Sequence, residues 1–281
     1  MAAAPVASAV SIPLVRAVGL RKSYRQPSLW TKKKRSVTAL DGVGLSLQPG
    51  SCTAVIGQSG AGKSTLASCL ARLEDVDEGE IWLEDVDFLG LRSETLRSAR
   101  TQVQLIFQDA TGALNPRLTA IELVEEPLLI QNIGNHSERR QSALQMLERF
   151  GIPVDRHYSR PEEFSGGQRK RIALARALVL RPRLLILDEV FSGLDVLVGA
   201  QILNDLLRLR AQEKLALLFI SHDLEFLAQA VDSIVVMHCG KIVEQGTFAE
   251  LATRAGDPHT KALITAHQEL RNMRASGAAA R

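Results

Sequence analysis

A glycine-rich stretch with one lysine and three hydroxyl side chains is the strongest chemical signal in the chain. It follows the apolar run 53–56 and precedes good helix formers, so a strand, a loop and a helix are predicted in that order. Glycines let successive backbone N–H groups face phosphate oxygens, and the helix start adds a positive dipole end. The spacing predicts a phosphate-binding loop, in which Lys63 reaches the β and γ phosphates of a nucleotide and Ser64 coordinates Mg²⁺. The loop comprises Gly57, Gln58, Ser59, Gly60, Ala61, Gly62, Lys63, Ser64 and Thr65.

A second candidate is the apolar run 184–187, which ends in the carboxylates Asp188 and Glu189. Many buried strands end in acidic residues, so this pattern is weak by itself. Downstream of a phosphate-binding loop it indicates the strand that holds the metal. Asp188 would then bind Mg²⁺, directly or through water, and Glu189 could polarise the water that attacks the γ-phosphate.

A serine and two glycines mark a third candidate at the start of a predicted helix that continues to Leu180. Such a helix start can hold an anion. The same residues would also serve as an ordinary N-cap, and only the two other motifs favour a functional role. The residues are Ser165, Gly166, Gly167 and Gln168, preceded by Phe164.

Strand-length apolar runs alternate with helical patterns over most of the chain. This alternation predicts an α/β core with a mostly parallel sheet. Between about 111 and 180 the strand signal fades, and apolar residues recur at helical spacing, which predicts a helical insertion. The strand-length runs are 53–56, 81–83, 103–107, 184–187, 215–220 and 234–237, and the helical runs of the insertion are 138–150 and 168–180.

Composition restricts the class of protein. With 281 residues, of which 46% are hydrophobic and 23% charged, the chain can bury a large core and does not resemble a disordered protein. A net charge of +3 is too small to indicate nucleic-acid binding. The three scattered cysteines fit neither a disulfide framework nor a zinc site, which favours a reducing compartment. The uncharged window 42–62 contains six glycines and is too polar to span a bilayer.

In this order, the motifs between about Leu14 and Val243 resemble the nucleotide-binding subunit of an ABC transporter. The resemblance implies a P-loop NTPase core of the RecA-like type, with an N-terminal antiparallel β part and an inserted helical subdomain. It identifies 164–168 as the family's signature motif, with Phe where Leu is usual. The implied segments are a tail at 1–13, the nucleotide-binding domain at 14–248 with its insertion at about 111–180, and a C-terminal helical tail at 249–281.

The resemblance also assigns roles to single residues. Gln108 matches the glutamine that touches Mg²⁺ and senses the membrane partner, and His222 matches the switch histidine. Without the resemblance, both would be assigned to an exposed loop or strand end. Asp195 ends a match to the D-loop, and Tyr24 fits the aromatic residue that stacks on adenine, with Trp30 nearby as the other aromatic.

The segment from Arg21 to Arg35 contains seven basic residues and is predicted to be a solvated loop or a surface that faces lipid head groups and a permease. A nucleic-acid patch is the alternative. A similar extension occurs in ATPases of the dipeptide, oligopeptide and nickel importers, which 113–117 and 257–263 also resemble. Val190 and Phe191 replace the usual Pro and Thr of the peptide importers, and such variation is more frequent in nickel-type members.

The resemblance implies an ATP-binding and ATP-hydrolysing importer subunit, peripheral on the cytoplasmic face of the inner membrane, that drives uptake of peptides or nickel. Its implied partners are two membrane permease subunits and a second ATP-binding subunit, the same or homologous. An extracytoplasmic substrate-binding protein would act indirectly, and no nucleic acid is expected. In the family two subunits stack head to tail, so that Ser165 and Gly167 of one clamp the ATP held by Lys63 and Ser64 of the other. Residues 108–127 would face the permease, unless they only stabilise a turn.

Two other functions are alternatives to this one. A soluble ABC-type ATPase that acts on nucleic acid or the ribosome usually fuses two nucleotide-binding units or inserts a long coiled coil, and this chain has neither. A regulatory partner that binds ATP without hydrolysing it is disfavoured by the presence of Glu189 and His222.

Overall fold

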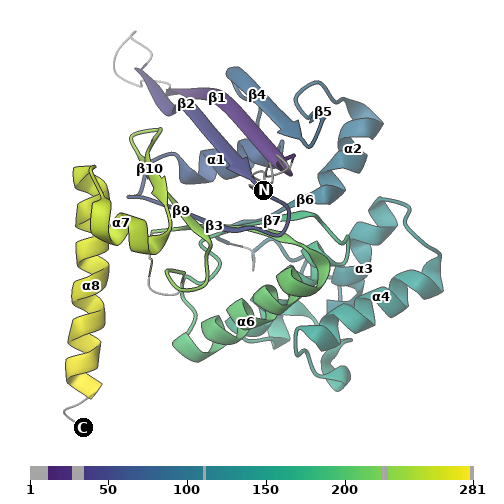
Figure 1. The fold of residues 1–281 in the computed structure, drawn as a ribbon. Helices are drawn as coiled ribbons and strands as arrows, with labels where there is room; N and C mark the ends of the chain where they lie inside the picture. The colour runs from purple at the N-terminus through teal and green to yellow at the C-terminus, as the bar shows by residue number, and fades with distance from the viewer. Residues whose placement is uncertain (1–11, 27–34, 110–111, 223, 225–226, 279–281) are drawn as a thin grey trace, which may run out of the picture.

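Two β-sheets organise the chain in the computed structural model, which describes residues 12–26, 35–109, 112–222, 224 and 227–278. Within this described part, one sheet has six strands in the order β10-β9-β3-β8-β7-β6, and the other has four in the order β2-β1-β4-β5. Figure 1 shows the four-stranded sheet at the top, the six-stranded sheet below it, and helices α3, α4 and α6 on the far side of the six-stranded sheet. The predicted α/β core with an antiparallel N-terminal part is confirmed.

The six-stranded sheet is parallel except at one edge, where β10 pairs antiparallel with β9. Strands β3 and β7 are buried at every position, as their continuous apolar sequences require in a sheet that is covered on both faces. Each predicted strand of this sheet is present, and β10 is an additional one. The strands are β3 (Cys52–Ile56), β6 (Val103–Ile106), β7 (Leu184–Asp188), β8 (Ala216–Ser221), β9 (Ser233–His238) and β10 (Lys241–Gly246).

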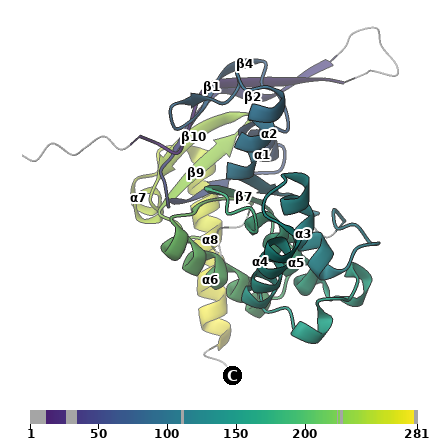
Figure 2. The same cartoon turned by 90° about the vertical axis from the view of Figure 1, so that its right-hand side faces the viewer.

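The four-stranded sheet is built on a long antiparallel pair, β1 (Val15–Gln26) and β2 (Arg35–Leu47), joined by β4 (Glu78–Leu83) and β5 (Val86–Asp87). Figure 2 shows this pair extending beyond the rest of its sheet. The loop predicted over 21–35 is therefore wrong at both ends, which are strand. Cross-strand pairing, including an ion pair between Arg21 and Asp41 at 2.8 Å, outweighs the charge of the segment. Residues 27–34, and 1–11 of the predicted tail, lie outside the described residues.

The helices cover both faces of the six-stranded sheet. In the expected helical region α3 packs on α4 and α5, and Leu123, Leu147 and Leu174 are fully buried there. Among the described residues, none of the helices combines the length and the apolar composition that a bilayer span requires. The helices are α1 (Lys63–Leu70), α2 (Ser93–Gln102), α3 (Ala120–Ile130), α4 (His136–Arg149), α5 (Gly166–Leu178), α6 (Val196–Glu213), α7 (Phe248–Arg254) and α8 (Pro258–Ala278), with short 3₁₀ turns η1 (Val154–Arg156) and η2 (Pro161–Glu163).

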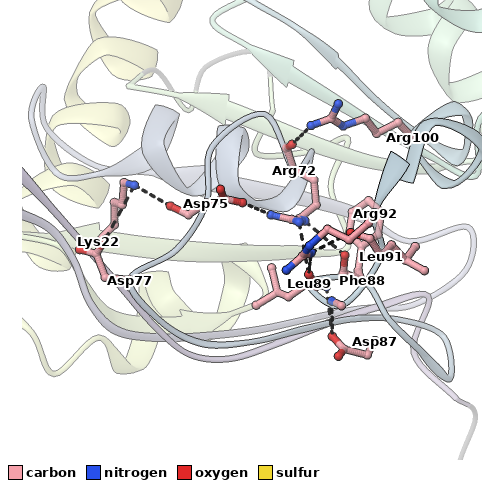
Figure 3. Close-up of polar contacts among 11 residues, drawn as sticks. Lys22, Arg72, Asp75, Asp77, Asp87, Phe88, Leu89, Leu91, Arg92 and Arg100 are labelled. Atoms are coloured by element: carbon pink, nitrogen blue, oxygen red, sulfur yellow. Dashed lines mark hydrogen bonds and ion pairs between the residues drawn. The ribbon is translucent and has the colours of Figure 1, made fainter. Parts of the chain in front are cut away.

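Arg72, just after α1, ties that helix to the four-stranded sheet (Figure 3). Its side chain is 6% exposed, and its guanidinium donates to the carbonyl oxygens of Phe88 at 3.2 Å and Leu89 at 3.3 Å, in the turn after β5. Arg72 also pairs with Asp75, whose backbone carbonyl accepts from Lys22 of β1 at 2.6 Å. The end of α1 is thereby fixed to the inner strand β1 and to the turn after the edge strand β5.

The start of α3 is held by a capping box. The backbone N–H of Thr119 donates to Glu122 Oε2 at 2.8 Å, and the Thr119 hydroxyl donates to the same oxygen at 2.7 Å. Because both bonds favour the carboxylate, they hold the pKa of Glu122 below its usual value. The cap therefore stabilises the chain above the unfolded-state pKa and is lost as the pH falls through the lower, folded-state value.

We expect Glu122→Ala to lower the free energy of unfolding by about 0.3–1.5 kcal/mol at neutral pH, because the cap is lost. The difference from wild type should shrink as the pH falls through the lowered folded-state pKa of Glu122, because the wild-type carboxylate is then protonated and the cap is lost there too. Urea denaturation at several pH values measures both effects. Glu148→Ala, at an exposed position of α4, is the matched control and should change little. A difference that persists at low pH would contradict the role assigned to the carboxylate.

Candidate nucleotide site

The predicted site residues gather at one edge of the six-stranded sheet. The phosphate-binding loop follows β3, Gln108 lies just after β6, Glu189 follows β7, and His222 follows β8. Because β3, β8, β7 and β6 are parallel neighbours, their carboxyl ends meet at the same edge. Ligands of open α/β sheets bind at such an edge.

The phosphate-binding loop runs close to backbone atoms of both sheets. A Cβ on Gly57 would lie 2.2 Å from the carbonyl oxygen of Met237 on β9, and a Cβ on Gly62 would lie 2.2 Å from that of Ala39 on β2. Gly62 also has φ +100°, which side chains disfavour. Both positions therefore require glycine. Between them, Gln58, Ser59 and Gly60 are exposed, which leaves their backbone open to a ligand.

Lys63 is the first residue of α1, and its side chain folds over the loop. The ammonium donates to the carbonyl oxygens of Gly57 at 2.7 Å and Gln58 at 3.0 Å. Burial lowers the pKa of Lys63, while the charges of Glu189 and Asp188 act in the opposite direction. A buried cation beside open backbone N–H groups can bind the phosphates of a nucleotide.

Asp188 is 6% exposed, and its Oδ1 has no hydrogen-bond partner among the described residues. Burial raises its pKa, and a hydrogen bond with the Ser64 side chain opposes this shift. A buried carboxylate oxygen beside a hydroxyl suits Mg²⁺, which commonly takes one or two protein oxygens together with water and substrate phosphates. Both residues therefore fit the predicted magnesium site.

Glu189 and His222 form a hydrogen-bonded pair. Glu189 Oε1 accepts from His222 Nδ1 at 2.8 Å and from the His222 backbone N–H at 3.1 Å. Glu189 has φ +50°, an unfavourable conformation for a side-chain-bearing residue, and its own N–H donates to the carbonyl of Ile220 at 2.9 Å. The carboxylate is 13% exposed and the imidazole 61%. This arrangement can orient a water molecule and accept its proton.

Tyr24 reaches the helix that carries the phosphate-binding loop. Its hydroxyl contacts Glu74 and lies 3.5 Å from Thr65 Oγ1. Partial burial raises the pKa of Tyr24, and the Glu74 hydrogen bond adds to this shift. The ring is 37% exposed and so can stack on a planar ligand. Trp30, the other candidate, lies outside the described residues.

Two other predicted residues serve as helix caps among the described residues. Ser165 caps α5: its Oγ accepts from the backbone N–H of Gln168 at 3.3 Å, and its own N–H donates to Gln168 Oε1 at 3.0 Å. Asp195 caps α6 by accepting from the N–H of Val198 at 2.9 Å. The N-cap interpretation of the signature residues thus holds in the single chain. Gly166 has open space where a Cβ would point, and Gln108 is exposed after β6.

One residue near the site was missed from the sequence. Lys170 on α5 is 8% exposed, and its ammonium donates to the carbonyl oxygens of Val190 at 2.8 Å and of Ser192. A usable signal was present, because Lys170 occupies the same helical stripe as the buried Leu174 and Leu178. A charged residue on an apolar stripe has a specific partner more often than not.

We expect Gly62→Ala to lower the free energy of unfolding by about 1–3 kcal/mol, since the new Cβ overlaps a backbone oxygen and φ stays positive. Gly60→Ala is the matched control. Gly60 also has positive φ, but no atom of the described residues lies within 4 Å of the added Cβ. Gly60→Ala should therefore lower the free energy of unfolding by less than Gly62→Ala does. Urea denaturation compares the two variants, and equal losses would contradict the close approach of the loop to β2.

Comparisons with known proteins agree with this geometry. Residues 40–192 match the family model described as ABC transporter. The dipeptide transport ATP-binding protein DppF of Haemophilus influenzae is 40% identical over 258 residues, which is 92% of this chain and 79% of that protein. DppF of Escherichia coli is 40% identical over 259 residues, 92% of this chain and 77% of that protein.

Solved structures give the same result. The ATP-binding cassette MJ0796, described as a dimeric post-hydrolysis state bound to ADP and Pi, superposes with a TM-score of 0.75 at 27% identity, covering 83% of this chain and 98% of that one. The cbiO1 structure of Clostridium perfringens, at 23% identity and a TM-score of 0.74, shares the fold over 87% of this chain and 92% of its own. The chain belongs to the ABC transporter family and is an ABC-type ATPase.

Proposed function

We propose that this chain hydrolyses ATP to drive the import of dipeptides or other short peptides through separate membrane permeases. The observation that carries the catalytic part is the pairing of Glu189 with His222 at the sheet edge where Lys63 and Asp188 also lie. The peptide assignment rests on relatives named as dipeptide transport ATP-binding proteins over 92% of the chain. Nickel, the alternative cargo, does not appear in the names of these relatives.

In the proposed reaction, each residue has a defined task. Lys63 and the backbone N–H groups of the loop bind the β and γ phosphates. Ser64 and Asp188 would hold Mg²⁺, with Gln108 as a further ligand, and the ion would supply positive charge against the phosphates. Glu189 accepts a proton from the attacking water, and His222 holds that carboxylate in place.

A second ATP-binding subunit, the same or homologous, would complete the site. Ser165 is the N-cap of α5 and Gly167 lies in its first turn, and both would contact ATP held by the partner. Val196 and Leu197, directly after Asp195, are 63% and 69% exposed, an apolar pair that a second subunit would cover. The MJ0796 cassette, which is described as dimeric, offers a precedent.

A groove between β6, α3 and α5 is the proposed permease-docking surface. Its cavity of about 310 Å³ is lined by Phe107, Pro127 and Ile130 among others, and Phe107 and Ile130 are 47% and 50% exposed. Asn115, by contrast, serves a turn, because its Oδ1 accepts from the backbone N–H of Arg117 at 3.1 Å. Docking there would make the chain peripheral on the cytoplasmic face of the inner membrane.

We expect Glu189→Gln to retain ATP binding and to reduce ATP turnover by about 10²–10⁴-fold, because no carboxylate remains to accept the proton. Mg-ATP at a hundredfold excess over Kd should still stabilise this variant by about 2.7 kcal/mol. Lys63→Ala is the contrasting variant and should lose most of this stabilisation. Thermal melting with and without Mg-ATP, together with phosphate release, measures both. Wild-type turnover in Glu189→Gln would refute the proposed role.

We expect Ile130→Glu to weaken assembly with the permeases or ATP-driven peptide uptake, because it places a charge in the apolar groove. Nucleotide affinity should be unchanged, since the groove lies apart from the phosphate-binding loop. Val154→Glu changes an apolar residue that is 66% exposed outside the groove and serves as the control. Co-purification and vesicle uptake test the surface. Normal assembly and uptake in Ile130→Glu would show that the groove is not part of the permease interface.

A further inference from the structure

The loop that follows Glu189 is held by a buried cation. Lys170 projects from the second turn of α5, and its ammonium donates to the carbonyl oxygen of Val190, one residue after Glu189, at 2.8 Å. It also donates to the carbonyl oxygen of Ser192. The N–H of Ser192 in turn donates to the carbonyl oxygen of Glu189 at 3.0 Å. These three hydrogen bonds fix the backbone on the carboxyl side of Glu189.

Helix packing alone does not require an ammonium at this position. Lys170 is 8% exposed, and burial is the cause that lowers its pKa. In the loop after Glu189, both acceptors of the Lys170 ammonium are neutral carbonyl oxygens. Burying a charge without an opposite charge is costly. An apolar residue would fit the stripe of Leu174 and Leu178 at lower cost, so the ammonium is better explained by the loop that it holds.

The same loop is strained and lies against the start of α5. Glu189 has φ +50°, which persists only when the surroundings impose it. Its N–H is fixed to Ile220 on β8, and Lys170 fixes the residues that follow. A Cβ on Gly167 would lie 3.0 Å from Val198 on α6, so the two helix starts are in close contact. The backbone that orients the Glu189 carboxylate is therefore held on both sides of that residue.

We propose that Lys170 is a positioning residue for ATP hydrolysis. Its ammonium holds the carbonyl oxygens of Val190 and Ser192 and thereby keeps Glu189 in the conformation that points its carboxylate to His222. In this role it acts through Glu189 alone. This inference rests on the proposed catalytic role of Glu189.

The test compares single and double variants of the full chain in steady-state ATP hydrolysis. Lys170→Met has nearly the same length but no donor, and it should reduce kcat by about tenfold to a hundredfold, the cost of a small misplacement of a catalytic group. KM and the Kd for Mg-ATP should change by less than about threefold, because the phosphate-binding loop is unaffected. Lys170→Gln keeps a shorter, uncharged donor and should recover part of kcat.

Arg171→Met is the matched control. Arg171 lies on the same helix, and its guanidinium donates to the carbonyl oxygen of Phe150 at 3.0 Å and to Gln201 of α6 at 2.8 Å. It makes no bond to the loop after Glu189. Its loss should lower the melting temperature while kcat per folded molecule stays near that of wild type. A drop in kcat equal to that of Lys170→Met would mean that the effect reports general helix packing, and would overturn the proposal.

The decisive comparison is the double variant Lys170→Met/Glu189→Gln. If Lys170 acts through Glu189, the double variant turns over ATP no more slowly than Glu189→Gln alone. The proposal would be overturned if the reductions in kcat caused by the two substitutions multiply in the double variant. A wild-type kcat in Lys170→Met would also overturn it. Should Lys170→Met fail to fold, Lys170→Gln replaces it in the same comparison. Wild-type turnover in Glu189→Gln itself would instead refute the proposed role of Glu189, so the two failures are distinguishable.

Discussion

The close approach of the phosphate-binding loop to backbone oxygens of both sheets is the constraint on which the site depends. Gly57 meets Met237 of the six-stranded sheet and Gly62 meets Ala39 of the four-stranded sheet. The backbone N–H of Gly240, in the turn after β9, donates to the carbonyl oxygen of Ala61 at 3.0 Å and adds a third contact. The loop is therefore one of the places where the two sheets are joined. A change in the relative position of the sheets would change the shape of the loop as well.

Burial shifts the two main charged groups of the site in opposite directions. It lowers the pKa of Lys63 and raises that of Asp188, so it disfavours the charged form of each group. The mutual attraction of the two charges and the Ser64 hydrogen bond offset part of this cost. A Mg²⁺-bound phosphate group placed between them would supply the opposite charge that each lacks. The proposed binding of a metal–nucleotide complex is consistent with these two shifts.

The sequence predicted the parts of the molecule that are local in the chain. The phosphate-binding loop, the acidic strand end and the buried strands of the six-stranded sheet follow from short motifs and apolar runs. The contacts of Lys170 with Val190, and of Tyr24 with Glu74, could not be predicted, because each joins residues that are far apart in the sequence. The strands at 21–26 and from Arg35 were missed for a related reason: their charged residues suggest a solvated loop until the cross-strand partners are known. The roles of Ser165 and Asp195 also cannot be judged from one chain, in which both serve as helix caps.

The central position of β3 has a consequence for how the chain is made. Both neighbours of β3 come late in the sequence, and Thr53 of β3 and Ser233 of β9 lie 180 residues apart. At ribosomal rates of about 5–20 residues per second, the strand that leads into the phosphate-binding loop waits on the order of ten seconds for its partners. During that time a largely apolar strand has two unpaired edges, the kind of segment that recruits other chains. Biosynthesis of this ATPase thus includes an interval in which a strand that is buried at every position in the folded chain needs protection from aggregation.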